Sequence, residues 1–169
     1  ISSGKTYKVG DYYNENGKEG VVFEVTPDGK HGKIVSMMQS VEKLQWSSDE
    51  IEQKRLIGAD GETDGAYNMA KVKAIEGWES KYPAFKWCAD LGEGWYLPSI
   101  EELLTIDKNK SRLNLNLTDK TFDHCYWSST EDCYQYSSGE FCAWYMNRGY
   151  TNRNNKNNRY NHVRAVSAF

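Results

Sequence analysis

The sequence contains few of the features that assign a function directly. Among its 169 residues, no apolar run approaches the ~20 residues that a membrane-spanning helix requires. There is no Cys-x-x-Cys motif, no internal repeat and no interdomain linker. No Asp or Glu occurs from Asn147 to the C-terminus. The lack of a long apolar run excludes a membrane span in this sequence. The lack of a repeat or linker favours a single domain over residues 1–169.

Pairs of residues that could perform catalysis are also missing. Glu101 and Glu102 are adjacent, and adjacent residues on a helix do not face each other. His31 falls in a predicted turn and His162 beside the last predicted strand, and neither has an evident nucleophile as partner. We therefore expect no catalytic residue and no enzymatic activity.

The four cysteines do not form a recognisable metal pattern. Cys88 is most simply a buried thiol on a helix, whereas Cys125, Cys133 and Cys142 fall within eighteen residues of one another. Two of these three could form a disulfide, or all could be free thiols. A zinc site that adds His124 is conceivable but lacks the spacing of paired ligands. We predict no metal and no cofactor, and the cysteines leave the cellular compartment open.

The sequence is rich in aromatic residues, with six Trp, twelve Tyr and five Phe. Mean hydropathy is -0.80, so its apolar content lies in large rings rather than in long aliphatic runs. The length is sufficient for one domain with a real core.

Strand signals occur at both ends of the chain. The apolar runs 21–25 and 33–37 flank a Pro-Asp-Gly turn and predict a β-hairpin. Residues 125–130, 141–146 and 162–169 also have the composition of strands. The alternating segment 113–117 predicts a short strand or an extended loop, and the polar segment 46–65 predicts a long surface loop.

Helix signals lie between these strands. Met69, Val72 and Ile75 have helical spacing within 66–78, and a second short helix is predicted from Pro83 to Gly92. Ser99 with Glu102 three residues later is a capping box that starts a third helix. The predicted class is α+β, with small antiparallel sheets and two or three short helices.

The most unusual segment is Asn147 to Asn161, which holds seven asparagines and no acid. Buried amides need hydrogen-bond partners, so we interpret this run as a polar loop held between two apolar segments. Side chains alternate along a strand. If Trp144 and Met146 point into the core, Tyr145 and Asn147 point outward and extend the loop surface.

Five motifs carry a resemblance to a known group of proteins. In order they are GWYLPS-x-EEL, YWSSTE, AWYMNRG, a lysine seven residues after that last glycine, and VRAVSAF. Together with the N-terminal YKVGDYY, this set resembles bacterial surface domains with a C-type-lectin-like fold. The group includes an uncharacterised gut-bacterial family and the variable proteins of diversity-generating retroelements. The resemblance runs from Tyr7 to Phe169.

The resemblance implies a division between scaffold and ligand-binding residues. The scaffold residues would be Trp95, Leu97, Pro98, Trp127, Ser128, Ser129, Ala143, Trp144, Gly149, Arg164 and Val166. Ligand contacts would come from about 131–161. We predict them from Tyr134, Tyr136, Tyr145, Asn147, Tyr150, Asn152, Arg153, Asn154, Asn155, Asn157 and Asn158.

The residue types in this segment fit adenine-directed mutagenesis of AAC codons. Such mutagenesis yields Asn, Tyr, Ser, Arg and Cys among others, but never Trp, Met or Lys. Trp144, Met146 and Lys156 would therefore belong to the fixed scaffold. The calcium-dependent sugar site of lectins is not expected, because the Glu-Pro-Asn, Gln-Pro-Asp and Trp-Asn-Asp motifs are absent.

The favoured function is non-catalytic recognition of a protein or glycan by a bacterial cell-surface or secreted protein, whose signal or lipoprotein leader would precede Ile1. A first alternative is polyanion binding, to nucleic acid or acidic glycan, with nucleic acid the less favoured ligand. It would use Arg148, Arg153, Lys156, Arg159, Tyr150 and Tyr160. A second alternative is a structural module of a surface appendage. The sequence specifies neither the ligand nor the oligomeric state.

Overall fold

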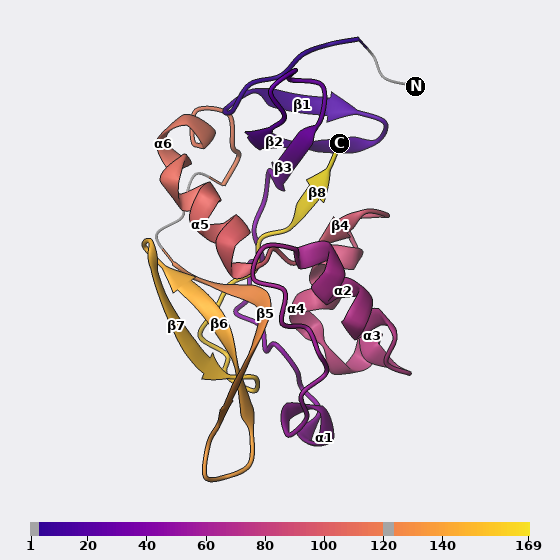
Figure 1. Ribbon diagram of the computed structural model, residues 1–169, viewed down its shortest axis with the longest axis vertical. Coiled ribbons are helices and arrows are strands. Elements are labelled where there is room, and N and C mark those ends of the chain that lie inside the picture. The colour runs from indigo at the N-terminus through magenta and orange to yellow at the C-terminus, as the bar shows by residue number, and fades with distance from the viewer. Residues whose placement is uncertain (1–3, 120–123) are drawn as a thin grey trace.

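The computed structural model describes residues 4–119 and 124–169, which form an α+β arrangement of two antiparallel sheets and short helices. The two sheets lie toward opposite ends of the long axis, and helices occupy the region between and beside them (Figure 1). The predicted class, α+β with antiparallel sheets, is therefore confirmed.

The larger sheet joins the two ends of the chain. Its strands, in spatial order, are β1 (Tyr12–Glu15), β2 (Lys18–Val25), β3 (Gly32–Ser36), β8 (Val166–Ala168) and β4 (Trp95–Tyr96). The predicted hairpin is confirmed as β2 and β3. The C-terminal strand β8 lies between β3 and β4, so that Val166 pairs with Val35 on one side and with Tyr96 on the other.

The described part of the chain contains six short helices, more than the two or three predicted. They are α1 (Glu50–Gln53), α2 (Gly65–Lys73), α3 (Trp78–Lys81), α4 (Pro83–Ala89), α5 (Ile100–Lys108) and α6 (Lys110–Leu113). The helix predicted over 66–78 is shorter, since α2 ends at Lys73, and Gly77, with a left-handed φ of 71°, precedes the separate helix α3. The strand or extended loop predicted at 113–117 is wrong, since α6 ends in a turn there.

Two helix starts follow the local signals closely. α4 begins at Pro83, as predicted. α5 begins with the predicted capping box, in which the Ser99 side chain accepts from the Glu102 amide and the Glu102 side chain accepts from Ser99 N. Cys88 is fully buried on α4, which confirms its predicted position.

The segment 46–65 is not the surface loop that its polarity predicted. Trp46 is fully buried, and its ring packs edge-on against Tyr82 and Phe85 at centroid distances of 5.7 and 4.9 Å. Glu52 of α1 is also buried and accepts a 2.7 Å hydrogen bond from the Tyr82 hydroxyl. Partners from α3–α4 thus allow a polar segment to enter the core.

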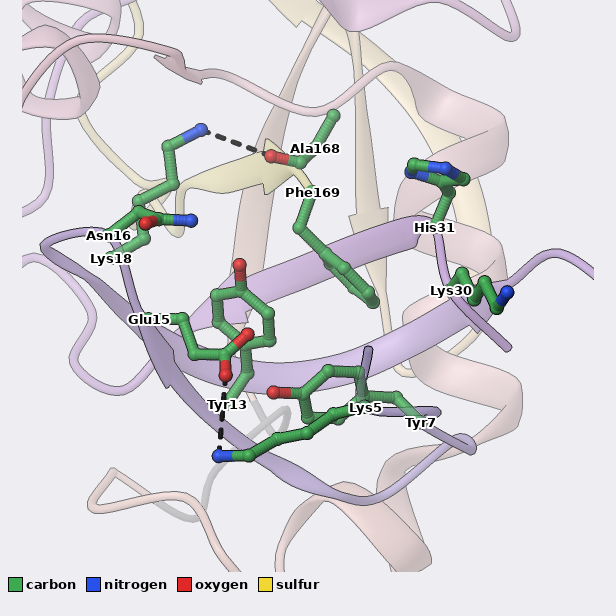
Figure 2. A pocket seen from close by; sticks show the side chains of 10 residues that line it. All are labelled: Lys5, Tyr7, Tyr13, Glu15, Asn16, Lys18, Lys30, His31, Ala168 and Phe169. Carbon is green, nitrogen blue, oxygen red and sulfur yellow. Dashed lines mark hydrogen bonds and ion pairs between the residues drawn. The ribbon is translucent and has the colours of Figure 1, made fainter. Parts of the chain in front are cut away.

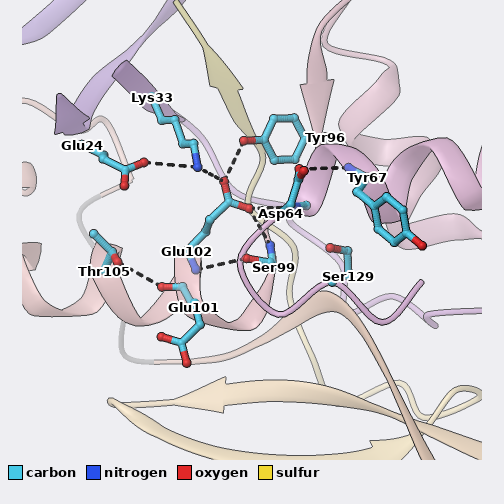
Figure 3. Close-up of polar contacts among 12 residues, drawn as sticks. Glu24, Lys33, Asp64, Tyr67, Tyr96, Ser99, Glu101, Glu102, Thr105 and Ser129 are labelled. Atoms are coloured by element: carbon cyan, nitrogen blue, oxygen red, sulfur yellow. Dashed lines mark hydrogen bonds and ion pairs between the residues drawn. The ribbon is translucent and has the colours of Figure 1, made fainter. Parts of the chain in front are cut away.

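The Glu102 carboxylate links several elements at the centre of the molecule (Figure 3). Its Oε1 accepts from Gly65 N at 2.9 Å and Ser99 N at 3.0 Å, and its Oε2 accepts from the Tyr96 hydroxyl at 2.7 Å. Lys33 Nζ lies 3.1 Å from the same oxygen. The GWYLPS-x-EEL motif is therefore structural, since one buried carboxylate links α2 and α5 to strands β3 and β4 of the larger sheet.

The smaller sheet contains β5 (Cys125–Gln135), β6 (Phe141–Asn147) and β7 (Tyr150–Asn155), paired in that order. The prediction of a loop from Asn147 onward is wrong over β7, whose six residues all pair with β6. Arg148 and Gly149 form the two-residue turn with φ values of 50° and 83°. Two positive φ values identify a type I′ turn, which matches the twist of paired strands.

Candidate functional site

The residues of the predicted recognition segment are carried by β5, β6, β7 and the chain that follows. Hydrogen bonds from buried side chains fix the backbone of these strands. The Ser128 hydroxyl donates to Trp144 O at 2.6 Å, and the Trp127 indole donates to Leu44 O at 2.7 Å. Asn68 donates to the Ser129 hydroxyl at 3.0 Å. The YWSSTE motif is thus a buried support for the sheet, not part of its exposed surface.

One face of the sheet holds an aromatic and guanidinium cluster, defined here as Asp132, Tyr134, Tyr136, Trp144 and Arg153. The Arg153 guanidinium lies 4.9 Å from the Trp144 ring centroid and 5.2 Å from that of Tyr134. It also forms a 3.0 Å ion pair with Asp132, and the Tyr134 and Tyr136 rings meet edge-on at 5.3 Å. These contacts hold large rings in fixed positions while leaving part of each open to solvent.

The prediction of which β6 side chains point into the core and which point outward is confirmed in part. Met146 is fully buried and Asn147 is exposed, as predicted. Trp144 and Tyr145 are both half-buried and both pack against the core, so burial does not separate them into one inward and one outward side chain. The reason is that both faces of β6 are partly covered, one by Arg153 and the other by the core.

None of the eleven predicted contact residues is fully buried. Tyr134, Asn147, Tyr150 and Asn152 are exposed, and Tyr150 is 80% exposed beside the hairpin turn. The remaining seven are half-buried: Tyr136, Tyr145, Arg153, Asn154, Asn155, Asn157 and Asn158. Antiparallel pairing places Asn147 opposite Tyr150, Tyr145 opposite Asn152 and Ala143 opposite Asn154, so part of the set shares one surface.

Lys156 follows β7 and is completely buried. Its Nζ lies 2.6 Å from Glu131 Oε2, donates to Arg55 O at 2.8 Å and sits 4.7 Å from the Trp46 ring centroid. Glu131 also accepts from Ile57 N at 2.9 Å. Burial lowers the pKa of Lys156, and Glu131 opposes that shift.

This burial corrects the residue set of the polyanion alternative. Lys156 is not available to a polyanion, and Arg153 is already paired with Asp132. Arg148 and Arg159 remain exposed, with Tyr150 and Tyr160 beside them in sequence. The sequence assigns Lys156 to the fixed scaffold because mutagenesis of AAC codons does not yield lysine, and its fully buried side chain is consistent with that role.

A depression that the sequence did not predict lies beside the β6–β7 turn. We call it the turn pocket; it has a volume of about 300 Å³ and is lined by Lys43, His124, Cys125, Asn147, Arg148, Tyr160 and His162. The two histidine rings lie 4.8 Å apart, and His162 Nδ1 is 3.0 Å from Ser40 O. Lys43 could not be found from the sequence, because it lies about eighty residues away from the nearest other lining residue.

A second depression lies in the larger sheet, remote from the recognition segment (Figure 2). The rings of Tyr7, Tyr13 and Phe169 pack on one another with centroids 4.6 to 5.4 Å apart. Burial and a hydrogen bond to Glu15 raise the pKa of Tyr7 to about 12. Because Tyr13 is buried and each ring contacts the other two, we interpret this cluster as packing of the sheet.

The described residues offer no metal centre. Within 4–119 and 124–169, no three His, Cys, Asp or Glu side chains lie together as a metal ion requires. All four cysteines are free thiols; Cys133 is exposed, and burial raises the pKa values of Cys88, Cys125 and Cys142. Over the same residues, no helix has the length and apolarity needed to cross a membrane.

The fold and this surface define an α+β domain in which buried polar contacts hold a partly exposed hairpin rich in Tyr, Asn and Arg. The chain belongs to the Lcl C-terminal domain family, whose model matches residues 36–167. The matched region contains the motifs from Gly94 to Lys156 and most of the final VRAVSAF. No curated protein matches the chain.

Proposed function

We propose that this domain is a recognition module that binds a partner through the surface of β5, β6 and β7. One observation carries the proposal. The backbone of the hairpin is held by buried contacts, Lys156 with Glu131 and Ser128 with Trp144, whereas the predicted contact side chains are all at least partly open to solvent. Such a division lets surface residues vary without loss of the fold.

The residue types on this surface suit recognition. Tyr and Trp supply rigid amphipathic area at low entropic cost, and Asn supplies adaptable donors and acceptors. In the aromatic and guanidinium cluster, Arg153 already holds Tyr134 and Trp144 in place, so less conformational entropy is lost on binding. The partner we propose is a protein or a glycan, and we propose no catalytic role.

The finer assignments are part of the same proposal. The family's link to variable proteins supports a segment at 131–161 diversified by a retroelement. The motifs support a C-type-lectin-like scaffold in a bacterial protein that is secreted or held at the cell surface. A reverse transcriptase gene and a near-copy of the segment encoding Tyr126–Phe169, found near this gene, would support diversification. Codons in the segment that do not derive from AAC would contradict it.

Binding is tested with a variant that changes only exposed side chains. In this variant Tyr134, Asn147, Tyr150 and Asn152 are replaced together by Ser, and its stability is compared with that of the parent by urea unfolding. Both proteins are then applied to a printed glycan array and to a phage-displayed peptide library. We expect ligands selected by the parent to lose at least tenfold in affinity for the variant.

A control variant carries four exposed substitutions remote from this sheet, at Lys8, Tyr12, Glu19 and Lys73, each to Ser. It should retain the parent's affinity. Equal affinity of all three proteins for every selected ligand would refute the recognition surface and favour a structural module.

A Tyr/Asn surface should also show only weak salt dependence. Polyanion binding would give a steep linear fall of log affinity with log salt concentration. The structure leaves Arg148 and Arg159 as the unpaired arginines of the segment among the described residues, so we expect a shallow slope.

A further inference from the structure

We propose that the turn pocket binds a carboxylate group presented by a peptide partner. The inference rests on the proposed function, because Asn147, Arg148 and Tyr160 belong to the recognition segment. It goes further by naming the chemical group recognised and by adding residues outside that segment, among them Lys43 and His162.

The pocket is assembled by main-chain contacts between distant segments. Cys125 opens β5 and pairs with Asn147 at the end of β6, which places the Arg148 turn beside the start of β5. His162 N donates to Cys125 O at 2.8 Å, and Trp127 N donates to His162 O at 3.0 Å. The walls are therefore fixed by paired backbone, and the exposed side chains of Lys43, Arg148 and Tyr160 can adjust to a ligand.

The charged side chains in the described lining of the turn pocket are all basic. Its described lining contains Lys43, Arg148 and two histidines, and no Asp or Glu. Neither Lys43 nor Arg148 forms an ion pair with any residue of 4–119 or 124–169. Burial raises the pKa of the Cys125 thiol, and the charges of both Lys43 and Arg148 oppose that rise. Among the described residues, two cations thus line one depression with no acidic side chain in its lining.

The donors available match a carboxylate. A guanidinium can donate two parallel hydrogen bonds to the two oxygens of a carboxylate, and the ammonium of Lys43 adds a second charged donor to the lining. Asn147 supplies an amide donor beside them. The 71% exposed ring of Tyr160 offers an apolar edge for the methylene groups of an acidic side chain.

Two observations favour a single acidic side chain over an extended polyanion. A volume of about 300 Å³ accommodates one side chain. The cations that would extend a track along the hairpin are neutralised, Arg153 by Asp132 and Lys156 by Glu131. Apart from Arg159, which donates a 3.3 Å hydrogen bond to Gln45 Oε1, the positive charge of this segment that has no ion pair among the described residues lies at the turn pocket, which suits an Asp or Glu side chain.

The test uses two capped peptides, acetyl-Gly-Glu-Gly-amide and its Gln counterpart, which differ only in the carboxylate. Each is titrated into ¹⁵N-labelled protein, and binding is followed by the amide shifts of Lys43, Asn147 and Arg148 and by the ring signals of both histidines. We expect saturable shifts with the Glu peptide at millimolar concentrations. The Gln peptide should cause none at the same concentrations.

Two variants remove one cation each. Arg148→Asn keeps a residue that tolerates the left-handed turn, and Lys43→Gln keeps the length of the side chain. Each should raise the dissociation constant of the Glu peptide about five- to tenfold, the effect of losing one charge-assisted hydrogen bond. Lys8→Gln removes an equal charge from an exposed site in the N-terminal segment and should change nothing.

Equal shifts with the Glu and Gln peptides, or equal weakening by Lys8→Gln, would overturn the proposal. In a further measurement, dextran sulfate is titrated into the parent protein and the same variants. If it binds with a steep salt slope while the Glu peptide does not bind, the pocket is a polyanion site and the peptide assignment is wrong. These results are independent of the array experiment, so the recognition surface could fail while the pocket binds, or the reverse.

Discussion

Lys156 Nζ lies 2.6 Å from Glu131 Oε2, with side-chain exposures of 0% and 3%. This pair connects the end of the polar hairpin to β5, and Lys156 also donates to Arg55 O. A buried charge is stable only with its partner and its further hydrogen bonds in place. The hairpin therefore depends on an ionic contact at its base, where the chain after β7 turns back to the core.

Removing the lysine should destabilise the whole domain. Lys156→Met leaves the Glu131 carboxylate buried without its counter-ion, and we expect a loss of about 3–5 kcal/mol in the free energy of unfolding. The double variant Lys156→Met with Glu131→Gln should recover part of it. Urea unfolding followed by tryptophan fluorescence measures both. Arg159→Met, an exposed change nearby, serves as control, and a loss equal to that of Lys156→Met would contradict this account.

Tyr96 should make stability depend on pH in the alkaline range. Burial, and then the Glu102 charge and hydrogen bond, raise the pKa of Tyr96 above its ordinary value of 10.0. The folded state thus binds this proton more tightly than the unfolded chain. The contribution is fully present below pH 10 and is lost as the pH rises toward the folded pKa.

Tyr96→Phe removes both the hydrogen bond and this pH dependence. We expect the variant to lose about 1–2 kcal/mol at pH 8 and to fall less steeply than the parent above pH 10. Urea unfolding at pH 8, 9, 10 and 10.5 gives the comparison. Parallel curves for the two proteins would show that Tyr96 is not the titrating group.

Gly149 should be required at the β6–β7 turn. Its φ is +83°, and a Cβ at this position would lie 2.8 Å from Asp107 Oδ2. Gly149→Ala should therefore cost about 1–2 kcal/mol of unfolding free energy through backbone strain and the displaced carboxylate. The control is Gly4→Ala, where φ is also positive but the added Cβ would meet no atom within 4 Å. Equal losses in the two variants would mean that the contact with Asp107 has no role.

Asp132 should limit the affinity of the hairpin for polyanions. Asp132→Asn breaks the ion pair with Arg153, which is 38% exposed, so stability should change by no more than about 1 kcal/mol. The freed guanidinium should strengthen binding to dextran sulfate and steepen the log–log salt slope by about one unit. A slope identical to that of the parent would indicate that Arg153 does not reach the polymer.

The four thiols should react at different rates. Cys133 is exposed, whereas Cys88 and Cys142 are buried, and burial raises the pKa of both buried thiols. With a water-soluble disulfide reagent we expect one fast phase from Cys133, a slower one from the half-buried Cys125, and two thiols that react only in denaturant. Cys133→Ser should abolish the fast phase; its persistence would refute the assignment.

Local signals in the sequence determined much of the fold. The β2–β3 hairpin, the start of α4 at Pro83 and the Ser99–Glu102 capping box were all predicted correctly. Each depends on residues close together in the chain, such as a turn dipeptide or a cap three residues before its partner. Such interactions can be read from spacing alone.

The strand β7 and the buried lysine were decided by the tertiary structure. β7 lacks the alternation of apolar and polar residues that marks a strand, because no face of it is fully buried. It forms because β6 offers a paired edge across a tight turn. Lys156 is buried because Glu131, twenty-five residues earlier, and the 46–58 segment meet it there. From the sequence alone a charged residue is expected to be exposed. Its counter-ion is distant in the sequence and comes within contact distance only in the folded chain.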